Sequence, residues 1–175
     1  MIICFIGGIG SGKTLSAVAY AKAHKKGKTV YSNIPLKFKH KIITAQYLND
    51  WSKDKKQFNN VIMLLDEGYL LFDSRRSQRK KSIENTHFIL QSRKKNVDIL
   101  ITAQSFRQLD VRVRDNVYYV IECKFLKDIK GLDYVVNKKY VIDSWGRFRL
   151  IKKYAICANA IYPLYDTSTI VLPDD

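Results

Sequence analysis

The feature that most constrains this chain is a glycine-rich turn close to its start. The sequence opens with MIICFIGGIGSGKTLSAVAYAK, in which the apolar run over residues 2–6 predicts a buried strand. Gly7, Gly12, Lys13 and Thr14 then match the spacing G-x-x-x-x-G-K-[ST]. The residues after the turn have a helical period and end in two lysines followed by a glycine. A strand, a glycine turn and a helix in this order are typical of a phosphate-binding loop, or P-loop.

The residue types in this turn predict a bound nucleoside triphosphate with Mg²⁺. Glycines let the backbone bring successive N–H groups around a phosphate, and the positive end of the following helix favours the same anion. Lys13 is expected to reach the β- and γ-phosphates, and the Thr14 hydroxyl to take one position on the metal. A glycine-rich turn with only a structural role is the alternative. The predicted nucleotide-binding residues are Gly7, Gly8, Ile9, Gly10, Ser11, Gly12, Lys13, Thr14 and Leu15.

Strand and helix patterns alternate along the middle of the chain. The runs VIMLLDE and DILITAQ are too short for helices and predict strands that are buried on both faces. Further strands are predicted in TVYSNI and VYYVIECKF. Helices are predicted around ITAQYLNDW, in IENTHFILQSRKK and, as a short helix after a turn, in FRQLDVRVRDN.

Towards the C-terminal end the pattern changes to one typical of antiparallel strands. GLDYVVNKKYVID and RFRLIKKYAI flank a turn at SWG and predict a β-hairpin, and the tail PLYDTSTIVLPDD is predicted to be extended. The sequence therefore predicts one α/β domain over residues 1–175. Its central sheet is expected to be mostly parallel, with an antiparallel C-terminal hairpin.

The charge of the chain is strongly unbalanced. Its 31 lysines and arginines against 16 acidic residues give a net charge of +15. Such an excess indicates a polyanionic partner, first nucleic acid and second an anionic membrane surface, although a host with lysine-rich proteins is an open alternative. The three cysteines form no CxxC pair, which predicts free thiols in a reducing cytoplasm. No apolar stretch approaches the roughly 20 residues that cross a bilayer, so we expect no membrane span and a cytoplasmic protein.

Two carboxylates follow a predicted buried strand. Asp66 and Glu67 end the run VIMLLDE, at the edge where open α/β sheets bind their ligands. Asp66 is expected to hold the Mg²⁺ shell, and Glu67 to accept a proton from an attacking water. The second carboxylate suits hydrolysis by water better than transfer to a bound hydroxyl. A strand that simply ends in two surface acids is the alternative.

Gln104 and several arginines are further candidates for the same site. Gln104 ends the run DILITAQ and is predicted to orient the water or to sense the γ-phosphate, with capping of the next turn as the alternative. An arginine from a neighbouring subunit often completes such sites, but each candidate can equally be a solvated charge or a DNA phosphate contact. The arginine-finger candidates are Arg75, Arg76, Arg93, Arg112 and Arg114.

The order of these motifs resembles the FtsK/HerA-like branch of P-loop ATPases, particularly the small Zot-like and viral DNA-packaging ATPases. The segments that carry the resemblance are GGIGSGKT, LLDEGYLLFDSRRS, ILQSRKKNVDILITAQSFRQLDVRVRDN and, more weakly, IYPLYDT. It implies a RecA-like three-layer P-loop fold whose copies form a homo-oligomeric ring, hydrolyse ATP and pull double-stranded DNA through a basic channel. By position, Lys13 and Thr14 correspond to Walker A, Asp66 and Glu67 to Walker B, and Gln104 to the polar sensor.

The sequence departs from these families in two respects. Zot proteins of filamentous phages carry a membrane-spanning segment after the ATPase domain, and larger FtsK and HerA proteins carry extra DNA-tracking or barrel domains; this sequence has neither. A soluble DNA pump is therefore favoured, gripping DNA through a partner, such as a viral capsid or portal, or through its own basic loops. A loop in RRSQRKK is the candidate, with a solvated surface loop as the alternative. The DNA-contact candidates are Arg75, Arg76, Arg79, Lys80 and Lys81.

The function that these features favour is an ATP-hydrolysing translocase that packages or moves double-stranded DNA for a virus or mobile element. One alternative is a small P-loop kinase of nucleotides or metabolites, although no segment indicates an acceptor pocket. Another is a Zot-like virion-assembly protein in which ATP sets only the conformation. Turnover of ATP separates the last alternative from the others, and stimulation by DNA separates the translocase from a kinase.

Overall fold

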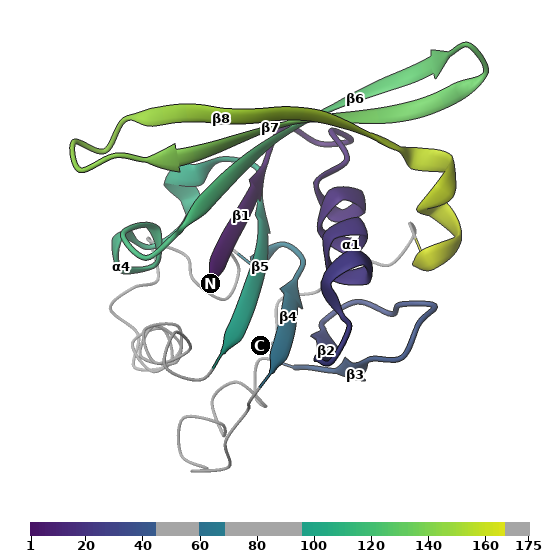
Figure 1. Cartoon of the computed structure of the whole chain (residues 1–175), viewed down its shortest axis with the longest axis horizontal. Helices are drawn as coiled ribbons and strands as arrows, with labels where there is room; N and C mark the ends of the chain where they lie inside the picture. Colours follow the sequence, from purple (N-terminus) through teal and green to yellow (C-terminus); the bar gives the residue numbers. More distant parts are fainter. Residues whose placement is uncertain (45–59, 69–95, 167–175) are drawn as a thin grey trace.

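A computed structural model of the chain describes residues 1–44, 60–68 and 96–166 (Figure 1). The strands in this part of the chain are β1 (Ile2–Ile6), β2 (Thr29–Ser32), β3 (Lys41–Ile42), β4 (Val61–Leu65), β5 (Val97–Ala103), β6 (Tyr119–Ile129), β7 (Leu132–Ile142) and β8 (Phe148–Cys157). The helices are α1 (Lys13–His24) and α4 (Val111–Arg114), with 3₁₀ turns η4 (Phe106–Gln108), η5 (Ala158–Ala160) and η6 (Tyr162–Leu164).

All eight described strands join one sheet, in the order β3-β2-β4-β5-β1-β6-β7-β8. From β3 to β6 every pair of neighbours is parallel, whereas β7 runs antiparallel to β6 and β8 antiparallel to β7. The three antiparallel strands cross over the end of α1 at the top of Figure 1, and their hairpins project to the two sides. The predicted α/β class, with a mostly parallel sheet and antiparallel C-terminal strands, is confirmed.

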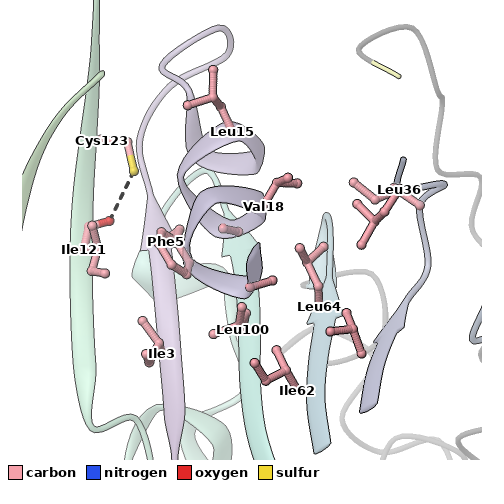
Figure 2. Packing of buried hydrophobic residues seen from close by; sticks show 14 of the residues in the cluster. Ile3, Phe5, Leu15, Val18, Leu36, Ile62, Leu64, Leu100, Ile121 and Cys123 are labelled. Atoms are coloured by element: carbon pink, nitrogen blue, oxygen red, sulfur yellow. Dashed lines mark hydrogen bonds between the residues drawn. The ribbon is translucent and has the colours of Figure 1, made fainter. Parts of the chain in front are cut away.

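Apolar residues cover both faces of the parallel strands. Every residue of β4 is buried, and so is every residue of β5, as their continuous apolar runs predict. On one face, Leu15 and Val18 of α1 pack against Phe5, Leu64 and Leu100 of the sheet (Figure 2). On the other face the sheet packs against buried residues of the segment around α4, Leu109, Val113 and Val117. The parallel sheet thus lies between two packed layers, and the P-loop connects the end of β1 to the start of α1.

The structure corrects two expectations about secondary structure and confirms a third. The predicted helix around ITAQYLNDW does not include Ile43, which lies just after the short strand β3 and outside any helix. The predicted C-terminal hairpin is present as β7 and β8, and the predicted strand VYYVIECKF is part of β6, which pairs with β7 through a tight turn in which Lys130 and Gly131 take positive φ angles. In the predicted extended tail, Pro163 and Leu164 lie in the 3₁₀ turn η6.

Some expectations fall on residues outside the described part of the chain. These are the helix in IENTHFILQSRKK, residues 45–51 of the helix around ITAQYLNDW and residues 167–175 of the extended tail. Among the helices within residues 1–44, 60–68 and 96–166, none has the length and apolar character to cross a membrane.

Candidate active site

The P-loop connects β1 to α1 through three glycines with positive φ angles. Gly7 has a φ of 149°, Gly10 of 72° and Gly12 of 84°. Residues that carry a Cβ rarely adopt these backbone conformations, so glycine at these positions lets the chain turn from strand to helix. Gly12 is the N-cap of α1 in the left-handed conformation, and Lys13 and Thr14 begin the helix.

Two of these glycines also touch the antiparallel strands. A Cβ at Gly7 would lie 2.7 Å from the backbone oxygen of Cys123 on β6, and 2.4 Å from Ser11 Oγ. A Cβ at Gly12 would lie 2.5 Å from Cγ2 of Val135 on β7. In the next turn of α1, Ser16 Oγ donates to Asn137 Oδ1 of β7 at 3.1 Å. The loop is therefore packed directly against β6 and β7.

The polar groups of the loop are of the kinds that bind an anion. Lys13 Nζ donates to the carbonyl oxygen of Gly8 at 2.8 Å, so its ammonium folds over the loop. Ser11 Oγ is buried and lacks a hydrogen-bond partner in the described structure. At the tip, 90% of the Ile9 side chain is exposed. An unpaired hydroxyl, a lysine and a helix N-terminus gathered around one loop fit the phosphates of a nucleotide.

The Asp66 carboxylate joins the P-loop to the ends of two strands. Its Oδ1 accepts a hydrogen bond from Thr14 Oγ1 at 2.7 Å and another from Thr102 Oγ1 at 2.8 Å. Thr102 in turn accepts a hydrogen bond from the backbone N–H of Glu67 at 2.8 Å. Thr14 comes from α1, Asp66 and Glu67 follow β4, and Thr102 lies in β5. A hydroxyl and a carboxylate at this spacing are the oxygen ligands that Mg²⁺ prefers, with phosphate and water completing its shell.

Asn33 positions Asp66 from a third strand and was not identified from the sequence. Its Nδ2 donates to the backbone oxygen of Asp66 at 2.8 Å, and its Oδ1 accepts from the Asp66 N–H at 2.7 Å. The amide thus extends the pairing of β2 with β4 by one residue, just where the carboxylate must be fixed. The position of Asn33 near the end of the predicted strand TVYSNI, together with a second predicted strand that ends in Asp66, is the signal that could have identified it.

Burial and charge act on both carboxyl groups. Burial raises the pKa of Asp66 above its usual range, and the hydrogen bonds from Thr14 and Thr102 and the Lys13 ammonium oppose that rise. Burial also raises the pKa of Glu67, with a further rise from the Asp66 charge and an opposing effect of Lys13. Glu67 has a φ of 49°, a conformation that is unusual for a side chain of this length. Such local strain is typical of functional sites.

Gln104 lies at the same edge of the sheet as the P-loop. The register pairs Ile6 with Ala103, so Gln104 comes directly after the β5 residue that faces the end of β1. Gln104 is exposed, and its backbone N–H donates to Gln108 Oε1 at 3.1 Å. The capping amide of this turn is therefore Gln108, and the Gln104 side chain is not the turn's cap.

Of the arginine-finger candidates, the structure describes Arg112 and Arg114. Arg112 is held within its own chain, because Nε and Nη2 donate to the two carboxylate oxygens of the buried Asp110, each at 2.9 Å. Arg114 has a buried Nε without a hydrogen-bond partner in the described structure. The candidates and DNA-contact residues outside the described residues are Arg75, Arg76, Arg79, Lys80, Lys81 and Arg93. The finger assignment stays a prediction.

The C-terminal segment also reaches this site. Tyr165 forms a β-bridge with Leu36, and the backbone N–H of Lys37 donates to the Leu164 oxygen at 2.7 Å. Burial raises the pKa of Tyr165 to about 12, and the charge of Asp66 contributes to that rise. The Tyr165 hydroxyl therefore lies within electrostatic range of the carboxylate that faces Thr14.

One protein family matches almost the whole length of this chain. The family model described as zonular occludens toxin (Zot) matches residues 1–170. The chain belongs to the Zot family. Its predicted resemblance to the Zot-like members of the FtsK/HerA-like group is thereby confirmed. A search of curated proteins found no match.

Solved structures share the fold of this Zot-family chain. The N-terminal domain of zonular occludens toxin from Neisseria meningitidis is 20% identical, with a TM-score of 0.64, over 94% of this chain and 98% of that one. The genome packaging NTPase B204 of Sulfolobus turreted icosahedral virus 2, in complex with ATP-gammaS, is 12% identical, with a TM-score of 0.57, over 86% and 96%. B204 from Sulfolobus turreted icosahedral virus, described as a DNA-packaging ATPase, is 15% identical, with a TM-score of 0.55, over the same shares. The Zot-family chain has the RecA-like fold of P-loop NTPases.

Proposed function

We propose that this Zot-family chain binds ATP with Mg²⁺ at its P-loop and hydrolyses it. The observation that carries the proposal is the Asp66 carboxylate, which accepts hydrogen bonds from Thr14 of the P-loop and from Thr102 of β5. That arrangement joins the phosphate-binding turn to a carboxylate pair. A second carboxyl group, on Glu67, comes one residue later and stays partly exposed.

Each residue has a distinct part in the proposed reaction. Lys13 exchanges its contact with the Gly8 oxygen for the β- and γ-phosphates, and Thr14 and Asp66 hold Mg²⁺. Mg²⁺, when bound, neutralises charge on the phosphate oxygens. Glu67 accepts the proton of the attacking water, for which its raised pKa is favourable, since a general base works best when its pKa approaches the working pH. Gln104, exposed at the end of β5, orients that water or senses the γ-phosphate.

The proposed use of this energy is movement of double-stranded DNA during assembly of a virus or mobile element, in the cytoplasm of its host. The net charge of +15 favours a polyanionic partner. Relatives with this fold are described as a genome packaging NTPase and a DNA-packaging ATPase. By analogy, the chain works as a homo-oligomeric ring, with one of the candidate arginines reaching a neighbouring site, and docks on a capsid or portal partner.

The test is ATP hydrolysis by the purified chain, with and without double-stranded DNA. Lys13→Ala should abolish turnover, while Glu67→Gln should keep nucleotide binding and slow turnover by about 10²–10⁴-fold, the usual contribution of a general base. Stimulation by DNA, and none by small hydroxyl acceptors, separates this function from a kinase. If Glu67→Gln hydrolyses ATP at the wild-type rate, the assignment of the base is refuted.

A second candidate function is an assembly factor in which ATP only sets the conformation. Membership of the Zot family favours it, because the family model that matches residues 1–170 is described as zonular occludens toxin and not as a packaging ATPase. Wild-type protein that binds ATP normally, yet shows no turnover with or without DNA, would establish this candidate in place of the first.

A further inference from the structure

The antiparallel end of the sheet carries a concentration of lysines that its fold does not explain. The register of β7 with β8 places Lys138 opposite Lys153 and Lys139 opposite Lys152. Two like-charge pairs on neighbouring rungs destabilise a sheet, because directly opposed side chains lie close together. Successive residues of a strand point to opposite faces, so each face of the sheet holds one of these pairs.

The four lysines are only partly compensated by their own chain. Lys138 forms an ion pair with Glu122 of β6 at 3.3 Å. Among the described residues, no acidic side chain pairs with the other three. Lys139 lies over the ring of Tyr119 and Lys152 over the ring of Tyr154, contacts that leave the ammonium charge in place. Burial lowers the pKa of Lys139, and the charge of Lys152 on the opposite strand lowers it further.

The β8 strand that carries two of these lysines is itself uncovered. It is the last strand of the described sheet, and its residues from Phe148 to Lys153 are all exposed, on both faces. Arg149 is one of these exposed residues and Arg147 comes directly before them, and the turn between β7 and β8 presents Trp145 with 79% of its surface exposed. In Figure 1 this hairpin projects beyond the body of the molecule.

Protection of a sheet edge explains only part of this pattern. Natural sheets place lysines and bulges on edge strands to prevent pairing with other chains, and β8 has both, with a bulge opposite Lys139 and Tyr140. That role accounts for Lys152 and Lys153. It does not account for Lys138 and Lys139, which lie on β7, inside the sheet and paired on both sides. The same features disfavour a second copy of the chain as the occupant of this edge.

We propose that the β7–β8 edge, defined by Lys138, Lys139, Lys152 and Lys153, is a nucleic-acid-binding surface that contacts the phosphate backbone without reading sequence. The four ammonium groups, one pair on each face, flank the β8 edge and supply charge complementarity there. Within the described sheet that edge pairs with no further strand, so it offers backbone N–H donors to phosphate oxygens. An anionic membrane is the less suitable partner, because lysines emerge from both faces and leave no purely apolar face to bury. The partner is shared with the proposed function, but these residues are separate from the P-loop and the basic run at 75–81.

The test is binding of labelled DNA by the full chain without nucleotide, followed by fluorescence anisotropy between about 50 and 200 mM salt. Lys152→Ser/Lys153→Ser is expected to weaken binding on the order of 10-fold at physiological salt and to reduce the salt slope by about 2, one unit for each lost phosphate contact. The matched control is Lys37→Ser/Lys39→Ser. It removes the same charge from exposed positions beside β3, at the opposite end of the sheet, and should keep the wild-type slope.

Three further measurements make the result decisive. The thermal midpoint of Lys152→Ser/Lys153→Ser should equal or exceed that of wild type, because opposed charges are removed, so weaker binding cannot be attributed to unfolding. A duplex and one of its strands are titrated in parallel, and lysine-dependent binding of either supports the proposal. The third measurement is binding of the wild type and of the two double variants to anionic vesicles of phosphatidylcholine with phosphatidylglycerol.

Two results would overturn the proposal. One is an equal loss of DNA binding in the two double variants, which would make the effect one of net charge. The other is lysine-dependent binding to the anionic vesicles with no DNA binding, which would assign the edge to a lipid surface. Because the assay needs no turnover, an inactive Lys13→Ala protein that still binds DNA through this edge would separate the inference from the proposed ATPase.

Discussion

The close contact between Gly12 and Val135 predicts a strong, reciprocal dependence of two residues that lie far apart in the sequence. Gly12→Ala places a methyl group 2.5 Å from Val135 Cγ2 at a φ of 84°. The left-handed conformation costs an alanine roughly 1–2 kcal/mol, and overpacking adds roughly 1–3 kcal/mol. We therefore expect the variant to lose about 2–5 kcal/mol of unfolding free energy, a large fraction of the total of a typical domain.

Val135→Ala separates the two contributions. Alone, it should cost about 2 kcal/mol through lost burial and a residual cavity. Combined with Gly12→Ala it removes the clash, so the double variant should be more stable than the sum of the single effects predicts, by about 1–3 kcal/mol. Urea unfolding of the nucleotide-free chain, analysed as a double-mutant cycle, measures this coupling.

The control for this cycle is Gly7→Ala with Val135→Ala. A Cβ at Gly7 meets the backbone oxygen of Cys123, which truncation of Val135 does not move, so this pair should be additive. If the Gly12 cycle were also additive to within about 0.5 kcal/mol, the packing of the P-loop against β7 would be refuted as the reason for glycine at that position.

Two other predictions concern Asp66 and its contacts, and a third concerns the burial of the cysteines. Asn33→Ala should lower the unfolding free energy by about 1–3 kcal/mol, measured in urea, because it leaves the partly buried N–H of Asp66 without its acceptor. Asp66→Asn should raise the thermal midpoint at neutral pH. Burial raises the folded pKa of this carboxyl, so its stabilising contribution is present at low pH and is lost as the pH rises through that pKa; the gain should therefore shrink on acidification. A thiol reagent should modify Cys157 in the native chain and spare Cys4 and Cys123, which react only in denaturant; burial raises the pKa of Cys123 to about 12.

Those parts of the fold that depend on local patterns could be predicted from the sequence. β4 and β5 are continuous apolar runs, and the turn between β1 and α1 is defined by its glycines and lysine, so their types were predictable without knowledge of their neighbours. The fold class follows from the alternation of these elements. The two-residue strand β3 has no such pattern, because its exposed Lys41 and Ile42 are ordered by pairing with β2.

The candidate site could likewise be predicted only where its residues belong to local sequence patterns. Lys13, Thr14 and Asp66 stand at fixed offsets within recognisable segments, so their types and spacing indicated their chemistry. Asn33 makes two hydrogen bonds to the backbone of Asp66, and Thr102 donates one from its hydroxyl to the carboxylate. These contacts exist only after β2, β4 and β5 have been placed in order. Residue type alone does not distinguish them from other polar residues at strand ends.

The glycines of the P-loop have two separate reasons to be glycine, and only one is visible in the sequence. Positive φ angles and access for phosphate follow from the motif itself. The second reason is the antiparallel layer: a backbone oxygen of β6 lies against Gly7, and Val135 of β7 lies against Gly12. A P-loop in open solvent would tolerate alanine at Gly12 at the cost of its conformation alone, whereas here the same change must also displace a strand. Since β7 continues from Val135 to the opposed lysines of the β7–β8 edge, the strand that limits the nucleotide loop is also the strand that carries half of the proposed nucleic-acid surface.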